Sequence, residues 1–369
     1  MSDKPRFAIL GAGNGGLAMA GHLALMGFPV SLFNRNEARI ALIRQTMEIQ
    51  VLANRESDDL PHGRASMDRV TSNMAEAIHD AEIIMVVAPA TAHRYMAEEA
   101  APHLRDGQIV VLNPGRTGGA LEFRHVIKEK GCTADVVVSE AQTLLYASRA
   151  SNPGQVNIFS IKNSVPIAAI PAYRTPEVVK RLSVAYPQFV PGDNALKTSL
   201  DNIGAIFHPA VTLLNAARIE TGRGDFEFYI EGISRSVAKA LEVIDVERVN
   251  VGKTLGFNCM SARDWLYVAY GAAGKTLFDS IRANEGYYGI KAPTLLDHRY
   301  LTEDVPMSLV PIASLGRHMD SPCPTIEAMI HLANVILGVD FWETGRTVES
   351  MGLSGLNLQQ IRRVILDGE

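Results

Sequence analysis

A glycine-rich turn close to the N-terminus constrains the fold of this chain more than any other feature. The apolar run Phe7–Leu10 leads into Gly11-Ala12-Gly13-Asn14-Gly15-Gly16, and helix-forming residues follow directly. In a G-x-G-x-x-G pattern the first glycine permits a tight turn, the second lets the backbone approach a diphosphate, and the third lets the helix pack closely on the strand. The amide-rich start of that helix favours phosphate. The pattern therefore predicts a dinucleotide-binding turn, whose expected cofactor contacts are Gly11, Gly13, Asn14 and Gly16.

The residues after the next apolar strand indicate which dinucleotide is bound. That strand, residues 29–33, lies at βαβ spacing from the glycine turn and leads into Asn34-Arg35-Asn36, with no acidic residue before Glu37. Folds that prefer NAD place an Asp or Glu here to accept the ribose 2′-hydroxyl, whereas an Arg suits a 2′-phosphate. We therefore expect Asn34 and Arg35 to contact the cofactor, with NADP(H) favoured and NAD(H) as the alternative. Alternatively, Arg35 is a solvent-exposed loop residue that does not contact the cofactor, and the sequence then does not favour NADP(H) over NAD(H).

Three further apolar runs predict more strands of the same sheet. Residues 82–88, 108–112 and 135–139 have the length and composition of parallel strands buried on both faces. Ligands of open parallel sheets bind beyond the carboxyl ends of the strands. We therefore expect Ala88 to contact the cofactor, and Arg116 and Glu140 to line the substrate pocket. An inter-domain salt bridge would explain Arg116 and Glu140 equally well.

The hydrophobic period changes in the second half of the chain. Strand signals fade from about Thr198, and helical patterns cover residues 200–220, 226–243, 261–270, 312–319, 325–337 and 358–366. Turn residues at 191–194 mark the change. The sequence thus predicts an α/β domain of the Rossmann type at residues 1–190, with a parallel sheet, followed by an all-α domain at residues 191–369. A cleft between two such domains is the default position for an active site.

Composition excludes several other classes of function. A formal net charge of -5 and a pI near 6.1 argue against a nucleic acid or an anionic membrane as partner. The three cysteines are scattered without metal-ligand spacing, so neither a metal site nor a disulfide scaffold is expected. No segment reaches the roughly 18 apolar residues of a membrane span, and the N-terminus lacks a signal-peptide core. The cytoplasm is the expected compartment.

Two segments of the helical half carry ionisable groups that a core does not need. His208 lies in an apolar stretch that begins at Asp201, and Asp304 lies in a polar insertion at residues 297–306. A His and an Asp brought together would form a proton-transferring pair, because the carboxylate orients the imidazole and stabilises its cationic form. A nearby Arg could bind a carboxylate through a two-point fork. Spacing alone favours the simpler interpretation of His208 as a buried, structurally satisfied histidine.

Four motifs give this chain a resemblance to a known family. They are the glycine turn, residues 112–123 (LNPGRTGGALEF), the Asn202-x-x-x-x-x-His208-Pro209 stretch, and the late run Arg299-Tyr300-x-x-Glu303-Asp304-Val305-Pro306. Over nearly its whole length the chain resembles the octopine/nopaline dehydrogenases, or opine dehydrogenases. The last two motifs are the discriminating ones, because many dehydrogenases share the glycine turn.

The resemblance implies a reaction and a site. The family condenses an amino acid with a 2-oxo acid such as pyruvate and reduces the imine with a nicotinamide cofactor. By motif, His208 and Asp304 match the catalytic pair, Arg299 matches the substrate-side arginine, and Asn202 is added as an expected substrate-binding residue. The resemblance also implies a C-terminal helical architecture similar to that of 6-phosphogluconate dehydrogenase. The long apolar helices would serve either packing within one chain or a homodimer interface.

Three other functions remain open from the sequence. A ketopantoate-like or hydroxyacid reductase that uses NADP would share both domains, but it usually relies on a catalytic Lys or Glu on the helical side, for which no equivalent stands out. A 6-phosphogluconate-type dehydrogenase is less favoured for the same reason. A nucleotide-sensing protein without turnover would keep the fold. The joint presence of His208, Arg299 and Asp304 speaks against such a sensor.

Overall fold

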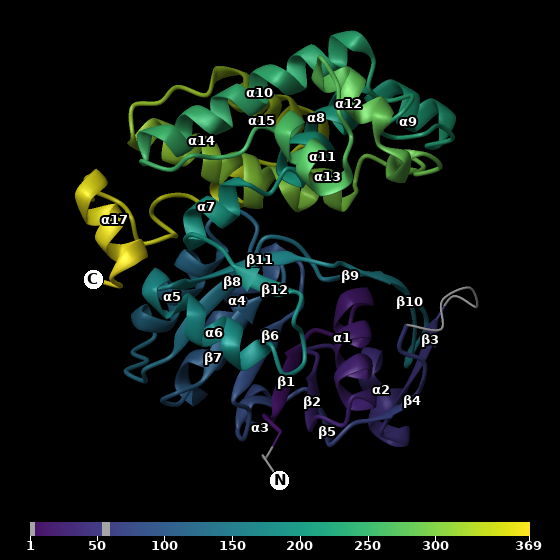
Figure 1. Cartoon of the computed structure of the whole chain (residues 1–369), viewed down its shortest axis with the longest axis vertical. Coiled ribbons are helices and arrows are strands. Elements are labelled where there is room, and N and C mark those ends of the chain that lie inside the picture. Colours follow the sequence, from purple (N-terminus) through teal and green to yellow (C-terminus); the bar gives the residue numbers. More distant parts are fainter. Residues whose placement is uncertain (1–3, 54–59) are drawn as a thin grey trace. The chain divides into compact units, whose positions relative to one another are not determined.

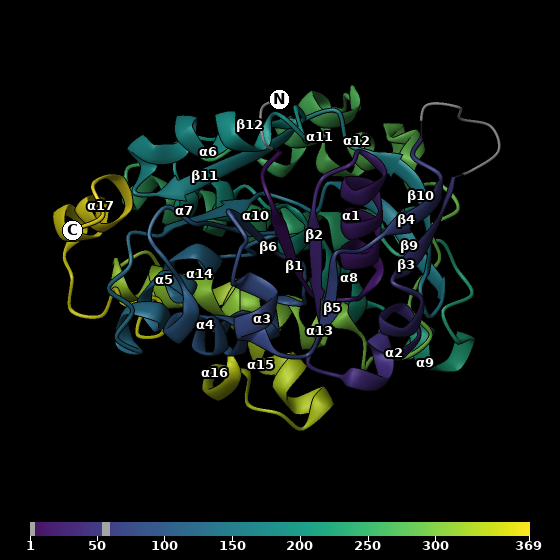
Figure 2. The same ribbon diagram turned by 90° about the horizontal axis from the view of Figure 1, so that it is seen from below.

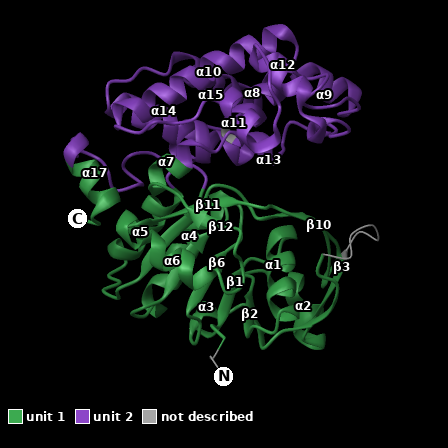
Figure 3. Cartoon of the chain, viewed as in Figure 1, with its two compact units in different colours: residues 1–115, 119–198, 360–369 green, residues 116–118, 199–359 purple. Residues whose placement is uncertain are grey.

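The chain folds into two compact units, which are described separately. In this computed structural model, residues 4–53 and 60–369 are described, so the polar stretch Arg55–Asp59 lies outside the described residues. Unit 1 comprises residues 1–115, 119–198 and 360–369, and unit 2 comprises residues 116–118 and 199–359 (Figure 3). Unit 1 carries the parallel sheet and unit 2 is helical, so the predicted fold class is confirmed.

The units are not divided where the sequence predicted, at 190/191. Residues 191–198 stay with the sheet, since β12 (Phe189–Pro191) pairs with β11 (Val165–Ile170) and the Gly192 amide donates to the Ile167 carbonyl at 2.7 Å. The last ten residues also join unit 1, where Arg124 donates to the Gly368 carbonyl at 2.5 Å. The domain assignment at 190/191 stays a prediction, because compact units need not coincide with functional domains.

Residues 116–118 leave the sheet unit for the helical one. The Thr117 amide donates to the Met307 carbonyl at 3.1 Å, and the Thr117 carbonyl accepts from Arg346 at 2.7 Å. Both partners belong to unit 2. These backbone contacts hold Arg116 within the helical unit, although its neighbours in sequence belong to the sheet.

The main sheet of unit 1 has the strand order of a dinucleotide-binding fold. Within the described residues it has eight strands in the order β12-β11-β8-β7-β6-β1-β2-β5, and every neighbouring pair is parallel except β11 and β8 (Figure 1). The order reverses between β1 and β6, which is where ligands bind in such sheets. The remaining bounds are β1 (Phe7–Leu10), β2 (Val30–Phe33), β5 (Arg69–Thr71), β6 (Ile83–Val86), β7 (Ile109–Leu112) and β8 (Val137–Ala141).

Helices connect these strands, and one of them occupies residues 37–46, where the sequence has a helical pattern. Apolar strands buried on both faces require such cover. The helices of this part are α1 (Asn14–Leu25), α2 (Glu37–Thr46), α3 (Met74–Ile78), α4 (His93–Ala100), α5 (Gly119–Glu129), α6 (Thr175–Leu182) and α7 (Ala195–Leu200).

A second, smaller sheet covers α1 and was not predicted. Its order is β4-β3-β10-β9, with bounds β3 (Glu48–Ala53), β4 (Gly63–Ser66), β9 (Tyr146–Asn152) and β10 (Gln155–Ile161). Helix α1 contacts β1 and β2 of the main sheet and all four strands of the small one, and Figure 2 shows it between them. The sequence indicates a strand or turn at residues 156–161 but not this sheet, because the pairing that joins its two antiparallel pairs, β3 with β10, spans about a hundred intervening residues.

A chain of hydrogen bonds fixes the buried face of α1. His22 Nδ1 lies 3.0 Å from the Tyr146 hydroxyl, which donates to the Tyr186 hydroxyl at 2.9 Å. Tyr186 in turn donates to the Met19 carbonyl at 3.4 Å. Both tyrosine hydroxyls use their protons in these two bonds, so Tyr146 can only accept from His22. The proton of the neutral His22 ring is therefore on Nδ1. Burial lowers the pKa of His22 from its usual 6.5 to about 4.

This buried histidine makes the stability of the protein depend on pH. Between pH 6.5 and 4 the unfolded chain binds a proton at His22, whereas the folded chain does not. The free energy of unfolding is therefore expected to fall by about 3 kcal/mol as the pH is lowered through this window. In His22→Gln the amide can still donate to Tyr146 but does not titrate, so the pH dependence should flatten. Urea unfolding at a series of pH values measures both proteins, and parallel curves would contradict the prediction.

Unit 2 is built from helices. Helix α10 is the longest, and among the helices of the described residues none is long and apolar enough to cross a membrane. The bounds are α8 (Gly204–Leu214), α9 (Ala216–Gly222), α10 (Arg235–Thr254), α11 (Ala262–Tyr270), α12 (Leu277–Ala283), α13 (Arg299–Thr302), α14 (Val310–His318), α15 (Pro324–Leu337) and α16 (Phe341–Thr344), with α17 (Leu358–Leu366) leading back to unit 1.

Two predicted helices of this half were wrong in extent. The pattern at 200–220 is divided between α8 and α9, and its first residue, Leu200, ends α7. The helix predicted at 226–243 instead begins at Arg235 and runs to Thr254. Ser234 caps its start by accepting from the Val237 amide. Residues 226–233 are mostly apolar and mostly buried without being helical, so their hydrophobic pattern reflects packing and not helix formation.

Candidate active site

His208 lies in the middle of α8, one turn after a glycine. Pro209 follows it within the helix, and the Thr212 hydroxyl donates to the His208 carbonyl at 2.7 Å. A Cβ atom at Gly204 would lie 3.2 Å from His208 Cε1, 3.3 Å from Asn202 Oδ1 and 3.6 Å from Arg116 Nη1. The absence of a side chain at Gly204 therefore lets these three groups approach one another, and it brings the predicted residue Asn202 to the same place.

The structure brings together the two residues predicted as a catalytic pair. His208 Nδ1 lies 2.8 Å from Asp304 Oδ2. Asp304 is fully buried, between α13 and a π-helical turn at Val305–Leu309. Such turns interrupt the regular helical hydrogen bonds and are frequent at functional sites. The carboxylate accepts the Nδ1 proton, which leaves Nε2 as the acceptor of the neutral ring.

Arg116 keeps Asp304 in its charged form. Its Nη1 lies 2.9 Å from Asp304 Oδ1. Burial alone would raise the pKa of Asp304, but the charge of Arg116 and the hydrogen bond from His208 outweigh burial and lower that pKa. The backbone of Arg116 adopts a left-handed conformation with a φ of 57°, which is uncommon for a residue with a side chain. A strained residue in such a cluster is typical of a functional site.

Glu303 links the two arginines that were predicted to bind substrate. Its Oε1 lies 3.5 Å from Arg116 Nε, and its Oε2 lies 2.9 Å from Arg299 Nη2. The Arg116 side chain is only 7% exposed, whereas that of Arg299 is 58% exposed. The charge of Arg116 is thus paired inside the protein. A substrate carboxylate could reach Arg299 more readily.

Two tyrosines complete the surroundings of the imidazole. The Tyr300 ring stacks on His208 with centroids 4.2 Å apart and planes 15° from parallel. The Tyr229 hydroxyl lies 3.1 Å from His208 Nε2. No role was predicted for Tyr300 from the sequence, although it lies inside a discriminating motif. The sequence has no signal for Tyr229, which lies in a segment predicted to be helical.

Glu140 belongs to unit 1 and holds the start of a helix there. Its Oε2 accepts from the Ala120 amide in the first turn of α5 at 2.7 Å. A carboxylate at a helix N-terminus is favourable, since it meets the positive end of the helix dipole. A Cβ atom at Gly115 would collide with this carboxylate, so Gly115 is needed for the packing. The predicted substrate contact of Glu140 stays a prediction beside this structural role.

The glycine turn has the geometry that a dinucleotide needs. Gly11 has a φ of +127°, and a Cβ atom there would collide with the Val87 carbonyl at the end of β6. A Cβ atom at Gly16 would collide with the Gly11 carbonyl, whereas one at Gly13 would meet no described atom within 4 Å. Gly13 therefore leaves open space at the N-terminus of α1, which fits a diphosphate. Ala88 lies beside this turn, as the position of β6 requires.

The other predicted cofactor residues have partners within unit 1. Asn14 Oδ1 accepts from the Ala150 amide at 3.0 Å, which ties α1 to β9. Asn34 Oδ1 accepts from the Asn36 amide at 2.9 Å and so shapes the turn after β2. The Arg35 guanidinium lies 5.2 Å from the centroid of the Tyr95 ring, within range of a cation–π contact.

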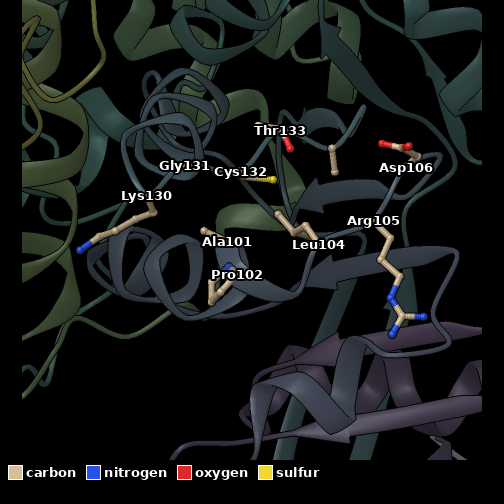
Figure 4. A pocket seen from close by; sticks show the side chains of 10 residues that line it. Ala101, Pro102, Leu104, Arg105, Asp106, Lys130, Gly131, Cys132 and Thr133 are labelled. Atoms are coloured by element: carbon tan, nitrogen blue, oxygen red, sulfur yellow. The ribbon is translucent and has the colours of Figure 1, made fainter.

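A surface pocket of unit 1 lies away from the glycine turn. It is lined by loops that precede β7 and β8, including Arg105, Asp106, Lys130 and Cys132 (Figure 4). These loops enter the amino ends of two parallel strands, whereas the glycine turn follows the carboxyl end of β1. The pocket therefore lies at the amino ends of the parallel strands, whereas the expected cofactor site lies at their carboxyl ends.

Comparison with known proteins agrees with this geometry. Residues 191–337 match the family model of the NAD/NADP octopine/nopaline dehydrogenase alpha-helical domain, and residues 6–138 match that of the NAD-dependent glycerol-3-phosphate dehydrogenase N-terminus. The opine dehydrogenase of Arthrobacter sp. (strain 1C) is 38% identical over 365 residues, which cover 99% of this chain and 100% of that protein. The chain belongs to the opine dehydrogenase family. It is therefore an NAD(P)-dependent oxidoreductase that acts on CH–NH groups, and this sets aside the reductase and sensor alternatives.

Solved structures share the fold of this opine dehydrogenase family member. Octopine dehydrogenase in complex with NADH and agmatine has a TM-score of 0.82 at 21% identity and covers 99% of this chain, with 98% of its own chain matched. The same enzyme has been solved with NADH and L-arginine and with NADH and pyruvate. Yersinopine dehydrogenase bound to NADP+ has a TM-score of 0.76 at 16% identity, with 100% of this chain and 99% of that chain covered. Both cofactors thus occur on this fold.

Proposed function

We propose that this family member uses NADPH to condense an amino acid with a 2-oxo acid such as pyruvate, and that it reduces the imine to an N-(carboxyalkyl)amino acid. The observation that carries the proposal is the buried hydrogen bond between His208 and Asp304, flanked by Arg116 and Arg299. Imine formation needs a group that first accepts and then donates a proton, and an imidazole held by a carboxylate suits that cycle. The octopine dehydrogenase complex with pyruvate supports the choice of 2-oxo acid.

The proton steps follow from the arrangement of the pair. The ammonium group of the amino acid loses a proton to His208, and its free electron pair attacks the carbonyl carbon of the 2-oxo acid. A proton then moves from the new C–N nitrogen to the alkoxide, which gives the carbinolamine. The imidazolium returns its proton to the carbinolamine hydroxyl, which leaves as water, and the protonated imine remains. His208 thus ends neutral, while the Asp304 carboxylate stabilises the cation in between. When bound, the reduced nicotinamide supplies the hydride that completes the product.

A comparison of cofactor consumption tests the function. The purified chain is mixed with NADPH and pyruvate, with and without a pool of amino acids, and the products are identified by mass spectrometry. We expect rapid consumption only when both substrates are present, with a product of the mass of the N-(carboxyalkyl)amino acid. Equal consumption with pyruvate alone would contradict the condensation with an amino acid, and no consumption with any amino acid would contradict pyruvate as the 2-oxo acid.

We also propose that Arg299 binds the carboxylate of a substrate. Arg299→Lys keeps the charge but loses the planar two-point contact, so KM for the 2-oxo acid should rise about tenfold, as expected for one charge-assisted hydrogen bond of about 1.5 kcal/mol. KM for the cofactor should hardly change. Amidation of the substrate carboxylate should then cost the parent enzyme much more than the variant. The same penalty in both would show that Arg299 serves only its ion pair with Glu303.

The preference for NADPH is proposed from the residues after β2. Arg35 stands where an NAD-preferring fold has an acid, so Arg35→Ala should raise KM for NADPH about tenfold or more and leave KM for NADH nearly unchanged. Steady-state kinetics with both cofactors measure this. Equal kcat/KM values for NADPH and NADH in the parent enzyme would contradict the proposal.

For the chain as a whole, we propose residues 1–190 as the cofactor-binding domain and residues 191–369 as the catalytic domain.

A further inference from the structure

The second ring nitrogen of His208 already has a partner in the protein. The Tyr229 hydroxyl lies 3.1 Å from His208 Nε2, the nitrogen that the Asp304 hydrogen bond leaves for chemistry. Since Nδ1 carries the proton, Nε2 accepts and the phenol donates. The imidazole is thus the middle member of an unbroken chain from Asp304 through His208 to Tyr229. A proton that leaves or reaches Nε2 along this chain must pass through the phenol oxygen.

The phenol is held firmly in that position. Its ring stacks on Tyr287 with centroids 4.0 Å apart and planes 14° from parallel, and Phe228 packs edge-on at 5.1 Å. The residue is only 7% exposed. On the other side, the stack of Tyr300 on His208 fixes the imidazole plane. Neither partner of the hydrogen bond is free to turn away without breaking a ring contact.

The chemical state of the phenol limits what it can do. Burial raises the pKa of Tyr229 well above its usual value, with Tyr300 adding to the shift, so the hydroxyl stays protonated at neutral pH. A neutral phenol is a poor base, but it can accept one proton while it donates another. This is the property that a relay needs, and it differs from the role of a general base.

We propose that Tyr229 relays the proton between His208 and the reacting amine. The inference rests on the proposed function and assigns the relay to a residue outside the recognised pair. In the forward step an N–H bond of the substrate ammonium breaks and a new O–H bond forms at Tyr229. At the same time the original O–H bond of Tyr229 breaks and an N–H bond forms at His208 Nε2. Tyr229 ends unchanged, the amine is neutral, and the reverse transfer later releases water from the carbinolamine.

The test compares Tyr229→Phe with the parent enzyme in the presence of cofactor, pyruvate and an accepted amino acid. Phenylalanine keeps the ring and its stacks but removes the hydroxyl. We expect kcat to fall about 10- to 100-fold, less than the loss expected for His208→Ala, with KM for cofactor and 2-oxo acid within about twofold of the parent. The control is Tyr270→Phe, which removes the hydroxyl of a half-exposed residue whose ring contacts Tyr287. It should retain parental activity.

Solvent isotope effects separate a relay from a positioning role. The rate of a single turnover is measured in mixtures of H₂O and D₂O. If the relay moves two protons in one step, the rate of the parent enzyme should depend non-linearly on the deuterium fraction. The solvent isotope effect of Tyr229→Phe should be smaller than that of the parent. A lower kcat with an unchanged isotope effect would show that Tyr229 only orients the ring and would overturn the relay.

Two other outcomes also decide the matter. A parental kcat in Tyr229→Phe would remove the phenol from the reaction. A lower KM for the amino acid with an undiminished kcat would show that the phenol merely fills the place of the amine before it binds, and this also overturns the relay. If NADPH consumption by the parent enzyme does not require an amino acid, the proposed function itself fails, whatever Tyr229→Phe shows. If the parent has this requirement but His208→Ala retains full activity, the proton-transfer role of His208 and the relay are overturned while the proposed function stands.

Discussion

His208→Ala and Asp304→Ala are each expected to lower turnover by about 10²- to 10⁴-fold, the usual contribution of general acid–base groups. The reason is the 2.8 Å hydrogen bond from His208 Nδ1 to a fully buried Asp304. Without the imidazole the proton has no acceptor. Without the carboxylate the imidazolium loses its stabilising charge and the ring loses its orientation. NADPH binding should persist in both variants, because its expected contacts lie in unit 1.

The double variant tests whether the two residues act as one unit. Removal of both should be little worse than the worse single variant, since residues that act together are strongly non-additive. Steady-state kcat for the four proteins measures the cycle, and fluorescence titration with NADPH checks binding. Asp304→Asn is the matched control for shape, because it keeps the size of the side chain and removes the charge. Two independent defects that multiply would show that the contact is structural.

Arg248→Met is expected to lower the free energy of unfolding by about 3–5 kcal/mol, because it removes one partner from buried ion pairs. Arg248 is fully buried in α10. Its Nη2 donates to Asp245 Oδ1 at 2.7 Å, and its Nη1 donates to the Leu200 carbonyl at 2.6 Å and lies 3.6 Å from Asp201 Oδ1. Arg248 also donates to the Met260 carbonyl. Methionine can fill the space, but it leaves two carboxylates and two carbonyls without the cation.

A surface ion pair of similar length provides the control. Arg317 Nε lies 2.7 Å from Glu327 Oε1, but its side chain is 56% exposed. Arg317→Met should therefore cost less than about 1 kcal/mol, as exposed pairs usually do. Urea denaturation of the three proteins at neutral pH gives both differences. Equal losses for the two variants would mean that burial does not govern the strength of the Arg248 contacts.

Local chemistry in the sequence determined the dinucleotide turn and several helices. Gly11 and Gly16 are required by close backbone contacts within one βαβ unit, so their pattern can be recognised without the rest of the fold. Helices with local capping signals were predicted closely: α11 begins after Ser261, whose side chain accepts from the Asp264 amide, and α2 begins after Asn36, which caps it in the same way. These signals lie within three residues of the helix start, which is why the sequence suffices.

Motif resemblance indicated the pairing of His208 with Asp304, and only the tertiary structure brought the two together. They are separated by 96 positions. The same holds for Arg116, which the sequence placed at the end of a sheet strand. The structure instead assigns it to the helical unit, where it is an ion-pair partner of Asp304.

The small sheet and Tyr229 depended on tertiary structure entirely. Strand β3 pairs with β10 across about a hundred residues, so the pattern of residues 156–161 indicates a strand or turn but not its partner. Residues 226–233 have a hydrophobic content that suits a helix, but they pack as an irregular buried segment that carries the Tyr229 hydroxyl to His208 Nε2. Hydrophobic content indicates that a segment is buried, whereas its conformation and its partners depend on the surfaces that bury it. Those surfaces come from distant parts of the chain and are formed only when it folds.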